Sequence, residues 1–273
     1  MRVPTVLLSL FALGLASFAG AAQPTWFDLI TEDAAVAREF YGELFDWEFE
    51  KQSATYSVAS HDGTKVAGIA EIHGRLPDLA EDFWLLGVEV DDVDECVTRA
   101  RKNGGTIHLK PKTAPGHGRY AVIVDPQGAA LALWKPEGGT RARPRSADDW
   151  VWTELWTSDP RAAVKYYKAV LGYDYRGIEV DGETYNVFTQ DENPQAGVLR
   201  TPYQEVAPNW VPYILVDDVR AVAARARELG GRVLLEPQDK LGRGEVVLIA
   251  DPSGAAFFAH ESNNEQREGG AGS

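Results

Sequence analysis

Cysteine and methionine are almost absent from this chain of 273 residues, which contains one of each. The lone thiol, Cys96, excludes an intrachain disulfide and the paired-cysteine motifs that bind zinc or exchange electrons. Basic residues are also few, since 27 Lys and Arg stand against 41 Asp and Glu and give a formal net charge of −14. A surface that binds nucleic acid needs clustered Lys and Arg, so we expect no nucleic-acid partner.

Long apolar runs are confined to the N-terminus. Arg2 precedes a stretch that is almost wholly apolar to Phe18, and small residues follow it up to Pro24. A basic start, a short hydrophobic segment and an A-x-A site are typical of a secretory signal peptide. We therefore expect residues 1–22 to be a signal peptide and the protein to be exported, with an uncleaved anchor as the alternative. No other segment is long enough to span a membrane, so no membrane contact is expected after cleavage.

Aromatic residues, in contrast, are plentiful: the chain has eight Trp, ten Tyr and ten Phe. With 44% hydrophobic and 25% charged residues, the composition is that of a globular protein. The length predicts about two domains. The aromatic surplus is the feature that the remaining sequence has to explain.

An internal repeat divides the chain into two modules. When the sequence is shifted by 126 positions, residues 84–134 lie over residues 210–260 without a gap, and twenty of these 51 positions are identical. The repeat is far longer than the unit of a solenoid, so it indicates a duplicated domain. The predicted organisation is a first module at 24–137, a linker at 138–147, a second module at 148–262 and a disordered tail at 263–273.

Each module predicts a βαβββ pattern with a second helix after the third strand, so that four half-units lie along the chain. Asp33 and Asp159 precede the first helices as N-caps, and Pro160 takes the first helical position. Asp91-Asp92 and Asp217-Asp218 each end a strand and are predicted to cap the second helices. Pairs of glycines end the second helices. The strands expected in the first module are 26–31, 55–59, 66–72, 84–90, 106–109, 119–124 and 129–134. Those equivalent to the first three in the second module are 152–157, 184–189 and 196–200.

These motifs carry a family resemblance. The aromatic pairs Phe40-Tyr41 and Tyr166-Tyr167, the repeated "VDDV" and "GG", and "DPxGA" before the last strand resemble the vicinal oxygen chelate superfamily. That superfamily includes glyoxalase I, bleomycin-resistance proteins and extradiol dioxygenases. The resemblance implies an α+β fold of two tandem glyoxalase-like modules, in which paired half-units curl mixed sheets into incomplete barrels around concave sites.

The metal ligands of the family are missing from both modules. Family enzymes hold a divalent metal through a His or Gln in the first strand, sometimes a His in the strand before "VDD", and a Glu in the last strand. The equivalent positions are Trp26 and Trp152, Leu85 and Val211, and Ala132 and Phe258. None of these side chains offers carboxylate oxygen or imidazole nitrogen, so we expect no metal, no cofactor and no metal-dependent glyoxalase or dioxygenase chemistry.

Aromatic side chains and two carboxylates replace the metal on the predicted concave faces. Because side chains alternate along a strand, Asp28 shares a face with Trp26, and Glu154 shares one with Trp152. Asp28 and Glu154 are candidates for a general base or for ligand binding, and a structural pairing with Arg119, Arg243 or a cluster of backbone N–H groups is the alternative. The candidate ligand-binding residues are Trp26, Trp134, Trp152, Trp156, Tyr213, Phe258 and His260. The alternative is volume filling for Trp26 and Trp152, and an exposed position without a role for His260.

Three functions remain open. The first is an exported protein that binds a small hydrophobic or aromatic molecule without a metal. The second is a metal-independent lyase, isomerase or hydroxylase-like enzyme in which Asp28 or Glu154 removes a proton. The third is an interaction protein with an acidic docking surface. We favour the first, and we expect a monomer because one chain already supplies four half-units.

Overall fold

A computed structural model of the protein describes residues 22–73, 82–115, 117–138, 150–180, 183–202, 206–239 and 245–261. Residues 1–21 of the expected signal peptide, residues 139–147 of the expected linker and the expected tail lie outside these ranges. Within the described part of the chain, no helix is long and apolar enough to cross a membrane.

Two modules follow each other along the chain with the same order of elements. The first contains β1 (Gln23–Thr31), α1 (Ala34–Phe45), β2 (Glu48–Lys51), β3 (Tyr56–His61), β4 (Thr64–Glu71), β5 (Phe83–Glu89), α2 (Val93–Lys102), β6 (Thr106–Ala114), β7 (Gly118–Val124) and β8 (Ala130–Pro136). The second contains β9 (Trp150–Thr157), α3 (Pro160–Leu171), β10 (Asp174–Val180), β11 (Glu183–Gln190), β12 (Asn193–Arg200), β13 (Asn209–Val216), α4 (Val219–Glu228), β14 (Arg232–Asp239), β15 (Glu245–Ala250) and β16 (Ala256–Glu261).

Each module builds one mixed sheet of eight strands. The strand order is β2-β3-β4-β1-β5-β8-β7-β6 in the first module, and the second repeats it as β10-β11-β12-β9-β13-β16-β15-β14. The central pair β1 and β5 is antiparallel, whereas β1 pairs with β4, and β5 with β8, in parallel. Neither sheet closes into a barrel. The predicted α+β fold of tandem modules with paired βαβββ units is therefore confirmed.

The helix caps follow the sequence. Asp33, Asp92, Asp159 and Asp218 cap the four helices, and each carboxylate accepts hydrogen bonds from one or two backbone N–H groups of the first turn. Each of these carboxylates therefore satisfies amide donors that would otherwise have no intrahelical acceptor. The second aspartate of each "VDD" motif is thus structural, as the sequence indicated.

Two strands were missed by the sequence pattern. We expected three strands between the first and second helix of each module, but the structure has four, because β2 and β10 add a strand at one edge of each sheet. In β2, the charged residues Glu48, Glu50 and Lys51 are exposed. The strand therefore lacks the alternation of apolar and polar residues by which strands are recognised. Charged residues are common on edge strands, where they hinder pairing with other chains.

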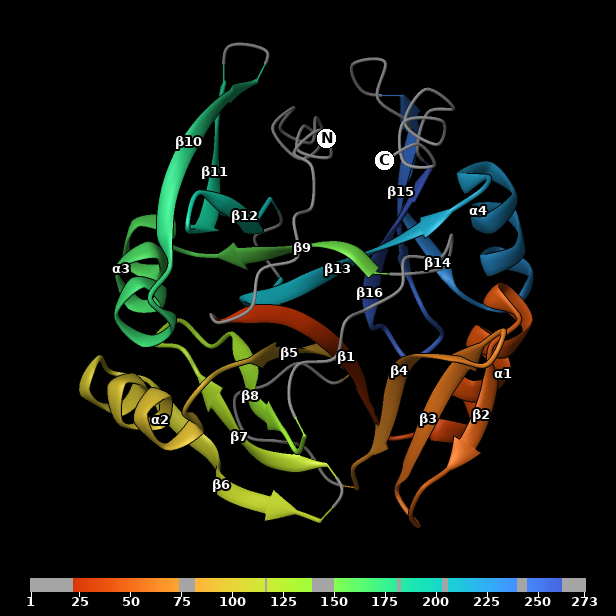
Figure 1. Ribbon diagram of the computed structural model, residues 1–273. Helices are drawn as coiled ribbons and strands as arrows, with labels where there is room; N and C mark the ends of the chain where they lie inside the picture. Colours follow the sequence, from red (N-terminus) through yellow and green to blue (C-terminus); the bar gives the residue numbers. More distant parts are fainter. Residues whose placement is uncertain are drawn as a thin grey trace, which may run out of the picture.

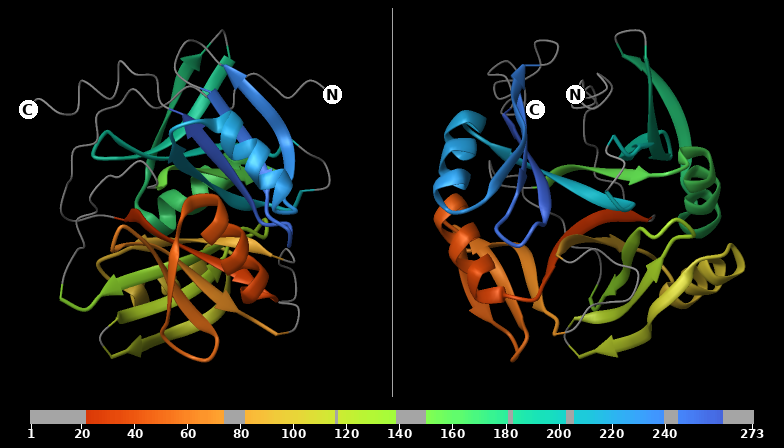
Figure 2. Two further views of the ribbon diagram at one scale, coloured as in Figure 1. Left: turned by 90° about the vertical axis from the view of Figure 1, so that its right-hand side faces the viewer. Right: turned by 180° about the vertical axis from the view of Figure 1, so that it is seen from behind.

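The two sheets lie back to back, with their concave faces pointing away from each other (Figures 1 and 2). Their convex faces and all four helices enclose one buried apolar core that draws residues from both modules. Helix α1 lies beside α4 and α2 beside α3, so each helix contacts a helix of the other module (Figure 1). The modules therefore form a single body around a shared core.

The repeated motifs meet at this interface in reciprocal pairs. The hydroxyl of Tyr41 donates to Asp251 Oδ2 over 3.0 Å, and the hydroxyl of Tyr167 donates to Asp125 Oδ2 over 3.2 Å. Both aspartates are buried and begin the "DPxG" turns, whose backbone N–H groups they also accept. The "FY", "YY" and "DP" motifs thus join the two modules.

The second glycine of each "GG" pair gives space to the same aromatic motif. A Cβ atom on Gly105 would lie 2.2 Å from the hydroxyl oxygen of Tyr166, and one on Gly231 would lie 2.8 Å from Cε2 of Phe40. The first glycines, Gly104 and Gly230, have positive φ angles, as expected of residues that end helices. The first glycine of each pair thus ends a helix, and the second leaves room for an aromatic side chain of the other module.

We predict that Asp251 makes the protein less stable as the pH rises from about 4 to about 6. Burial raises the pKa of Asp251 to about 6, so the folded protein keeps a proton that the unfolded chain has already released. The contribution is complete below the unfolded pKa, is lost through this window, and is constant above it, for a total of about 2–3 kcal/mol. Urea unfolding of the wild type and of Asp251→Asn across this pH range measures the difference. A constant difference between the two proteins would contradict the prediction.

Candidate functional site

The same polar unit occurs on the concave face of each sheet. It consists of a Trp-x-carboxylate on the first strand, a tyrosine two strands away and a glycine on the strand between them. In the first module, Asp28 Oδ1 accepts from Trp26 Nε1 over 2.9 Å and from the Tyr56 hydroxyl over 2.8 Å. We call this set, with Gly68, the carboxyl–tyrosine unit of the first module. Its counterpart is Trp152, Glu154, Tyr185 and Gly197.

The glycine lets the tyrosine reach across the sheet. Gly68 is the partner of Asp28 in the parallel pair of β1 and β4. A Cβ atom there would lie 1.9 Å from Asp28 Oδ1 and 2.3 Å from the Tyr56 hydroxyl oxygen. On Gly197 it would lie 1.9 Å from the Tyr185 hydroxyl oxygen. Any other residue at either position would therefore separate the tyrosine from its carboxylate.

Asp28 is half-buried on an otherwise apolar face. Burial raises the pKa of its carboxyl group, and the hydrogen bonds from Trp26 and Tyr56 oppose that rise without cancelling it. Burial and the neighbouring Asp28 also raise the pKa of Tyr56, so this phenol stays protonated and remains a donor. Both donors bond to Oδ1. Within the described part of the chain, no hydrogen bond to Asp28 Oδ2 is found.

Glu154 occupies a sealed environment in the second module, where only 1% of the residue is exposed. Its Oε1 accepts from the Tyr185 hydroxyl over 2.5 Å, and its Oε2 accepts from Trp156 Nε1 over 3.3 Å. The Tyr213 hydroxyl is hydrogen-bonded to the same carboxylate. Both oxygens of Glu154 are therefore engaged by the protein itself, which suits a structural role.

The concave face of the second module is filled by its own side chains. Tyr213 and Phe258 are stacked with ring centroids 4.3 Å apart, and Trp156 meets Phe258 edge-on at 6.1 Å. All three are at most 2% exposed. His260, beside them on β16, is 4% exposed, and burial lowers its pKa to about 4, so it is neutral near pH 7. Four of the seven predicted ligand-binding residues therefore lie in a packed aromatic cluster.

The equivalent face of the first module carries smaller residues. Ile30, Gly87 and Ala132 take the positions of Trp156, Tyr213 and Phe258. The strand pairing puts Gly87 between Trp26 and Ala132, so the row that reads Trp-Tyr-Phe in the second module reads Trp-Gly-Ala here. Ala132 is partly exposed, and so are several of the other residues that line this face. These neighbours are Ala70, Ile72, Val122 and Val124.

The remaining three predicted ligand-binding residues lie at the margins of the two faces. Trp26 and Trp152 are half-buried members of the two carboxyl–tyrosine units, and Trp152 Nε1 donates to the Tyr185 hydroxyl over 3.3 Å. Trp134 is half-buried near the end of β8, and its Nε1 donates to the backbone carbonyl of His117 over 3.0 Å. Two of these tryptophans, Trp26 and Trp134, belong to the first module.

The residues at the family's metal positions do not fit a metal ion. In the first module these positions hold Trp26, Leu85 and Ala132, which offer no oxygen or imidazole ligand. Among the described residues, no group of three or more His, Cys, Asp or Glu side chains is arranged to hold a metal. Asp28 is a single carboxylate whose Oδ1 already accepts two hydrogen bonds.

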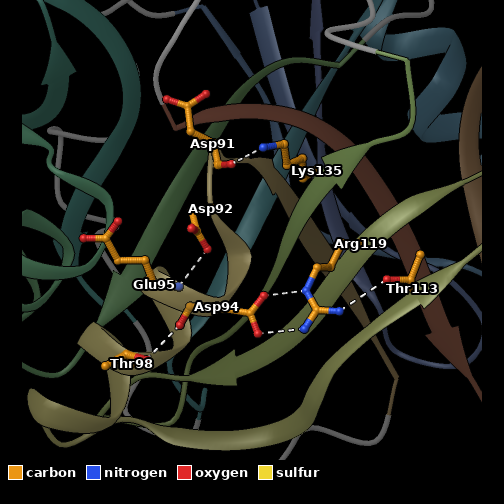
Figure 3. A network of polar contacts seen from close by, with 8 residues as sticks. All are labelled: Asp91, Asp92, Asp94, Glu95, Thr98, Thr113, Arg119 and Lys135. Atoms are coloured by element: carbon orange, nitrogen blue, oxygen red, sulfur yellow. Dashed lines mark hydrogen bonds and ion pairs between the residues drawn. The ribbon is translucent and has the colours of Figure 1, made fainter.

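Arg119 is not the partner of Asp28, contrary to the pairing that we considered from the sequence. Its guanidinium group binds Asp94 near the start of α2, with Nη2 2.7 Å from Oδ1, and Nη1 donates to Thr113 (Figure 3). The network also holds Lys135, whose Nζ donates to the carbonyl of Asp91 over 2.6 Å. It fixes α2 on the sheet edge, while tryptophan and tyrosine donors bind Asp28. The other suggested partner, Arg243, lies outside the described residues.

The strand pattern indicates sheet packing for Tyr56 and Tyr185 and gives no role to Gly68 and Gly197. The equivalence of the two tyrosines across the repeat is nevertheless visible in the sequence. The glycines match only when the offset changes from 126 to 129, because the hairpin after the first helix is longer in the second module. A tyrosine and a glycine that keep the same spacing in both copies were the available signal.

We predict that Tyr185→Phe destabilises the protein more than Tyr56→Phe. Removing the Tyr185 hydroxyl leaves an oxygen of buried Glu154 without its short donor, which costs about 1–3 kcal/mol. Asp28 is half-buried and can take a water molecule instead, so Tyr56→Phe should cost less than about 1 kcal/mol. The free energies of unfolding from urea titrations give both values, and equal losses would show that the two units are equally sealed.

Comparisons with known protein families agree with the fold. Residues 23–133 match the Glyoxalase/Bleomycin resistance protein/Dioxygenase superfamily, and residues 150–259 match a glyoxalase-like domain. The putative glyoxylase CFP32 of Mycobacterium tuberculosis is 33% identical over 243 residues, which are 86% of this chain and 92% of that protein. The anthracycline biosynthesis protein DnrV of Streptomyces peucetius is 33% identical over 255 residues, with 87% and 92% covered.

Solved structures with the same fold are more distant in sequence. The Mn(II)-bound glyoxalase from Novosphingobium aromaticivorans superposes with a TM-score of 0.62 at 14% identity, and 89% of this chain and 83% of that one are covered. The 2,3-dioxygenase LapB from Pseudomonas sp. KL28 gives the same TM-score at 13% identity, with 90% and 94% covered. The chain therefore belongs to the glyoxalase, bleomycin resistance protein and dioxygenase superfamily, with two tandem modules of that fold.

Proposed function

We propose that the protein is an exported binding protein that holds a small hydrophobic or aromatic molecule on the concave face of its first module, without a metal ion. One observation carries the proposal: two copies of one face exist in the chain, and only the second is filled by its own aromatic side chains. The first face keeps the partly exposed carboxylate of Asp28 among small apolar residues, which include Ala70 and Ala132.

The chemistry of this face suits an apolar ligand with one polar anchor. Apolar surface supplies most of the binding free energy of a small molecule, while a few placed polar groups fix its orientation. Asp28 supplies the polar group, and Trp26 and Tyr56 hold its carboxylate in place. The names of the Streptomyces relatives, which are anthracycline biosynthesis proteins, support a flat aromatic ligand.

We predict that naphthalene, as a neutral aromatic probe, binds the wild type and the Ala132→Ser variant but not Ala132→Phe. Position 132 corresponds to Phe258 of the second module, so a Phe side chain here would cover the concave side of β8. A Ser side chain keeps the small size of Ala. Saturation-transfer NMR with each purified protein measures binding, and circular dichroism verifies folding. Binding that persists in folded Ala132→Phe would place the ligand elsewhere and contradict the proposal.

A second function is favoured by the carboxyl group of Asp28. Its raised pKa and its unengaged Oδ2 are properties of a general base, which works best when its pKa approaches the operating pH. This function is a metal-independent lyase, isomerase or hydroxylase-like activity in which Asp28 removes a proton from the bound molecule. Glu154 does not share these properties, because both of its oxygens accept hydrogen bonds from buried side chains.

The variant Asp28→Asn separates these two functions. It keeps the size of the side chain but removes its basicity, so an enzyme should lose at least about a hundredfold in turnover while it still binds substrate. Glu154→Gln serves as the matched control in the other module and should leave turnover unchanged. The assay measures the incorporation of deuterium from deuterated water into the bound compound. Incorporation that persists in Asp28→Asn would exclude Asp28 as the base.

Export is the remaining part of the proposal. The basic start, the apolar segment and the small residues before Pro24 support it. We predict that the protein isolated from the culture medium or the periplasm begins at Ala22 or Gln23, as found by N-terminal sequencing. Recovery of the protein only from the cytoplasm, with Met1 or Arg2 at its start, would contradict export.

A further inference from the structure

The second module shows what occupies a carboxyl–tyrosine unit when it is complete. In both modules a tyrosine hydroxyl bonds to one carboxylate oxygen, Oδ1 of Asp28 or Oε1 of Glu154. The two units differ at the other oxygen. In Glu154 it accepts the indole N–H of Trp156. For Asp28 Oδ2, the described part of the chain supplies no donor.

The donor in the second module comes from a position that is aliphatic in the first. Trp156 lies two residues after Glu154 on β9, and Ile30 lies two residues after Asp28 on β1. An isoleucine has no N–H to offer. The first module has therefore kept the acceptor of this hydrogen bond and has an aliphatic residue where the donor would be.

The ring contacts differ in the same direction. In the second module the Trp156 indole meets Phe258 edge-on at 6.1 Å, and Phe258 stacks on Tyr213 at 4.3 Å. Ala132 and Gly87 stand at these two places in the first module. Three aromatic rings and one N–H donor are thus present on one face and replaced by smaller residues on the other.

We propose that the first module binds a planar aromatic molecule with an N–H or O–H group, and that this group donates to Asp28 Oδ2 while the ring lies where Trp156, Tyr213 and Phe258 lie in the second module. This inference rests on the proposed function and adds the chemical class of the ligand to it. The indole of Trp156 is, in this sense, a copy of the ligand built into the same chain.

The negative charge of Asp28 further restricts the chemical class of the ligand. An ionised Asp28 attracts a donor and repels a carboxylate or phosphate on the ligand. Aromatic acids should therefore bind worse than neutral phenols, indoles or aromatic amines.

The test compares indole with 1-methylindole on the wild-type protein. The two probes have nearly the same ring, but only indole has an N–H, and indole-3-carboxylate adds a negative charge. Chemical shifts of the Gly68 and Gly87 amides report binding at the first module. We expect indole to bind about tenfold more tightly than 1-methylindole, as a hydrogen bond to a charged acceptor provides. We expect indole-3-carboxylate to bind more weakly than indole.

Two variants assign this preference to the first module. Asp28→Asn should remove the preference for indole, because an amide group can turn its own N–H toward the ligand. Glu154→Gln makes the same chemical change in the second module and should leave the preference intact. A preference that survives in Asp28→Asn, or one that is lost in Glu154→Gln, would overturn the inference.

The outcomes also separate this inference from the proposed function. If indole and 1-methylindole bind equally well at Gly68 and Gly87, the face binds aromatic molecules but Asp28 does not select a donor, so only the further inference fails. If neither probe nor naphthalene shifts these amides, the proposed function fails as well.

A third variant tests the idea of a built-in copy without relying on the first module. Trp156→Ile gives the second module the residue of the first and leaves Glu154 without its indole donor. Indole should then raise the melting temperature of Trp156→Ile by more than it raises that of the wild type. In the same variant, 1-methylindole should raise the melting temperature by less than indole does. Equal effects of the two probes on this variant would contradict the role assigned to the N–H group.

Discussion

The architecture depends on burying the two convex sheet faces against each other. Each sheet is apolar on both sides, and helices cover only part of the convex side, so a single module would expose much of its core. The other module covers the remainder and also satisfies a buried carboxylate, because Tyr41 bonds to Asp251 and Tyr167 bonds to Asp125. Once the convex faces are joined, the concave faces must point outward, and this places them where a molecule from solution could reach them.

Duplication has let the two concave faces diverge while their polar unit stayed the same. The second face is filled by the packed side chains of Trp156, Tyr213 and Phe258, which are buried around Glu154. The first face gives up this packing and keeps a carboxylate that is only half-buried. Functional sites commonly carry such a cost in stability, which the rest of the fold offsets.

Much of the fold could be predicted because it repeats. The tandem modules, the four capping aspartates and the faces of the central strands follow from alternation, capping rules and the "DPxGA" turns. The edge strands β2 and β10 did not, since their residues are exposed on both faces and carry no apolar pattern. The roles of "FY" and "GG" could not be predicted either, because both depend on contacts between residues far apart in the chain.

The candidate site was predicted in part. Alternation placed Asp28 and Glu154 on the concave faces, and the apolar residues at the metal positions were visible in the sequence. Which face is filled could not be read from composition, since it depends on the register that brings Gly87 between Trp26 and Ala132 in one module and Tyr213 between Trp152 and Phe258 in the other. The reciprocal contacts between modules have one more consequence. The surface that each half offers to the other is nearly self-complementary, as in a twofold-symmetric dimer, so an ancestor of one module could have assembled from two identical chains before the gene was joined to its copy.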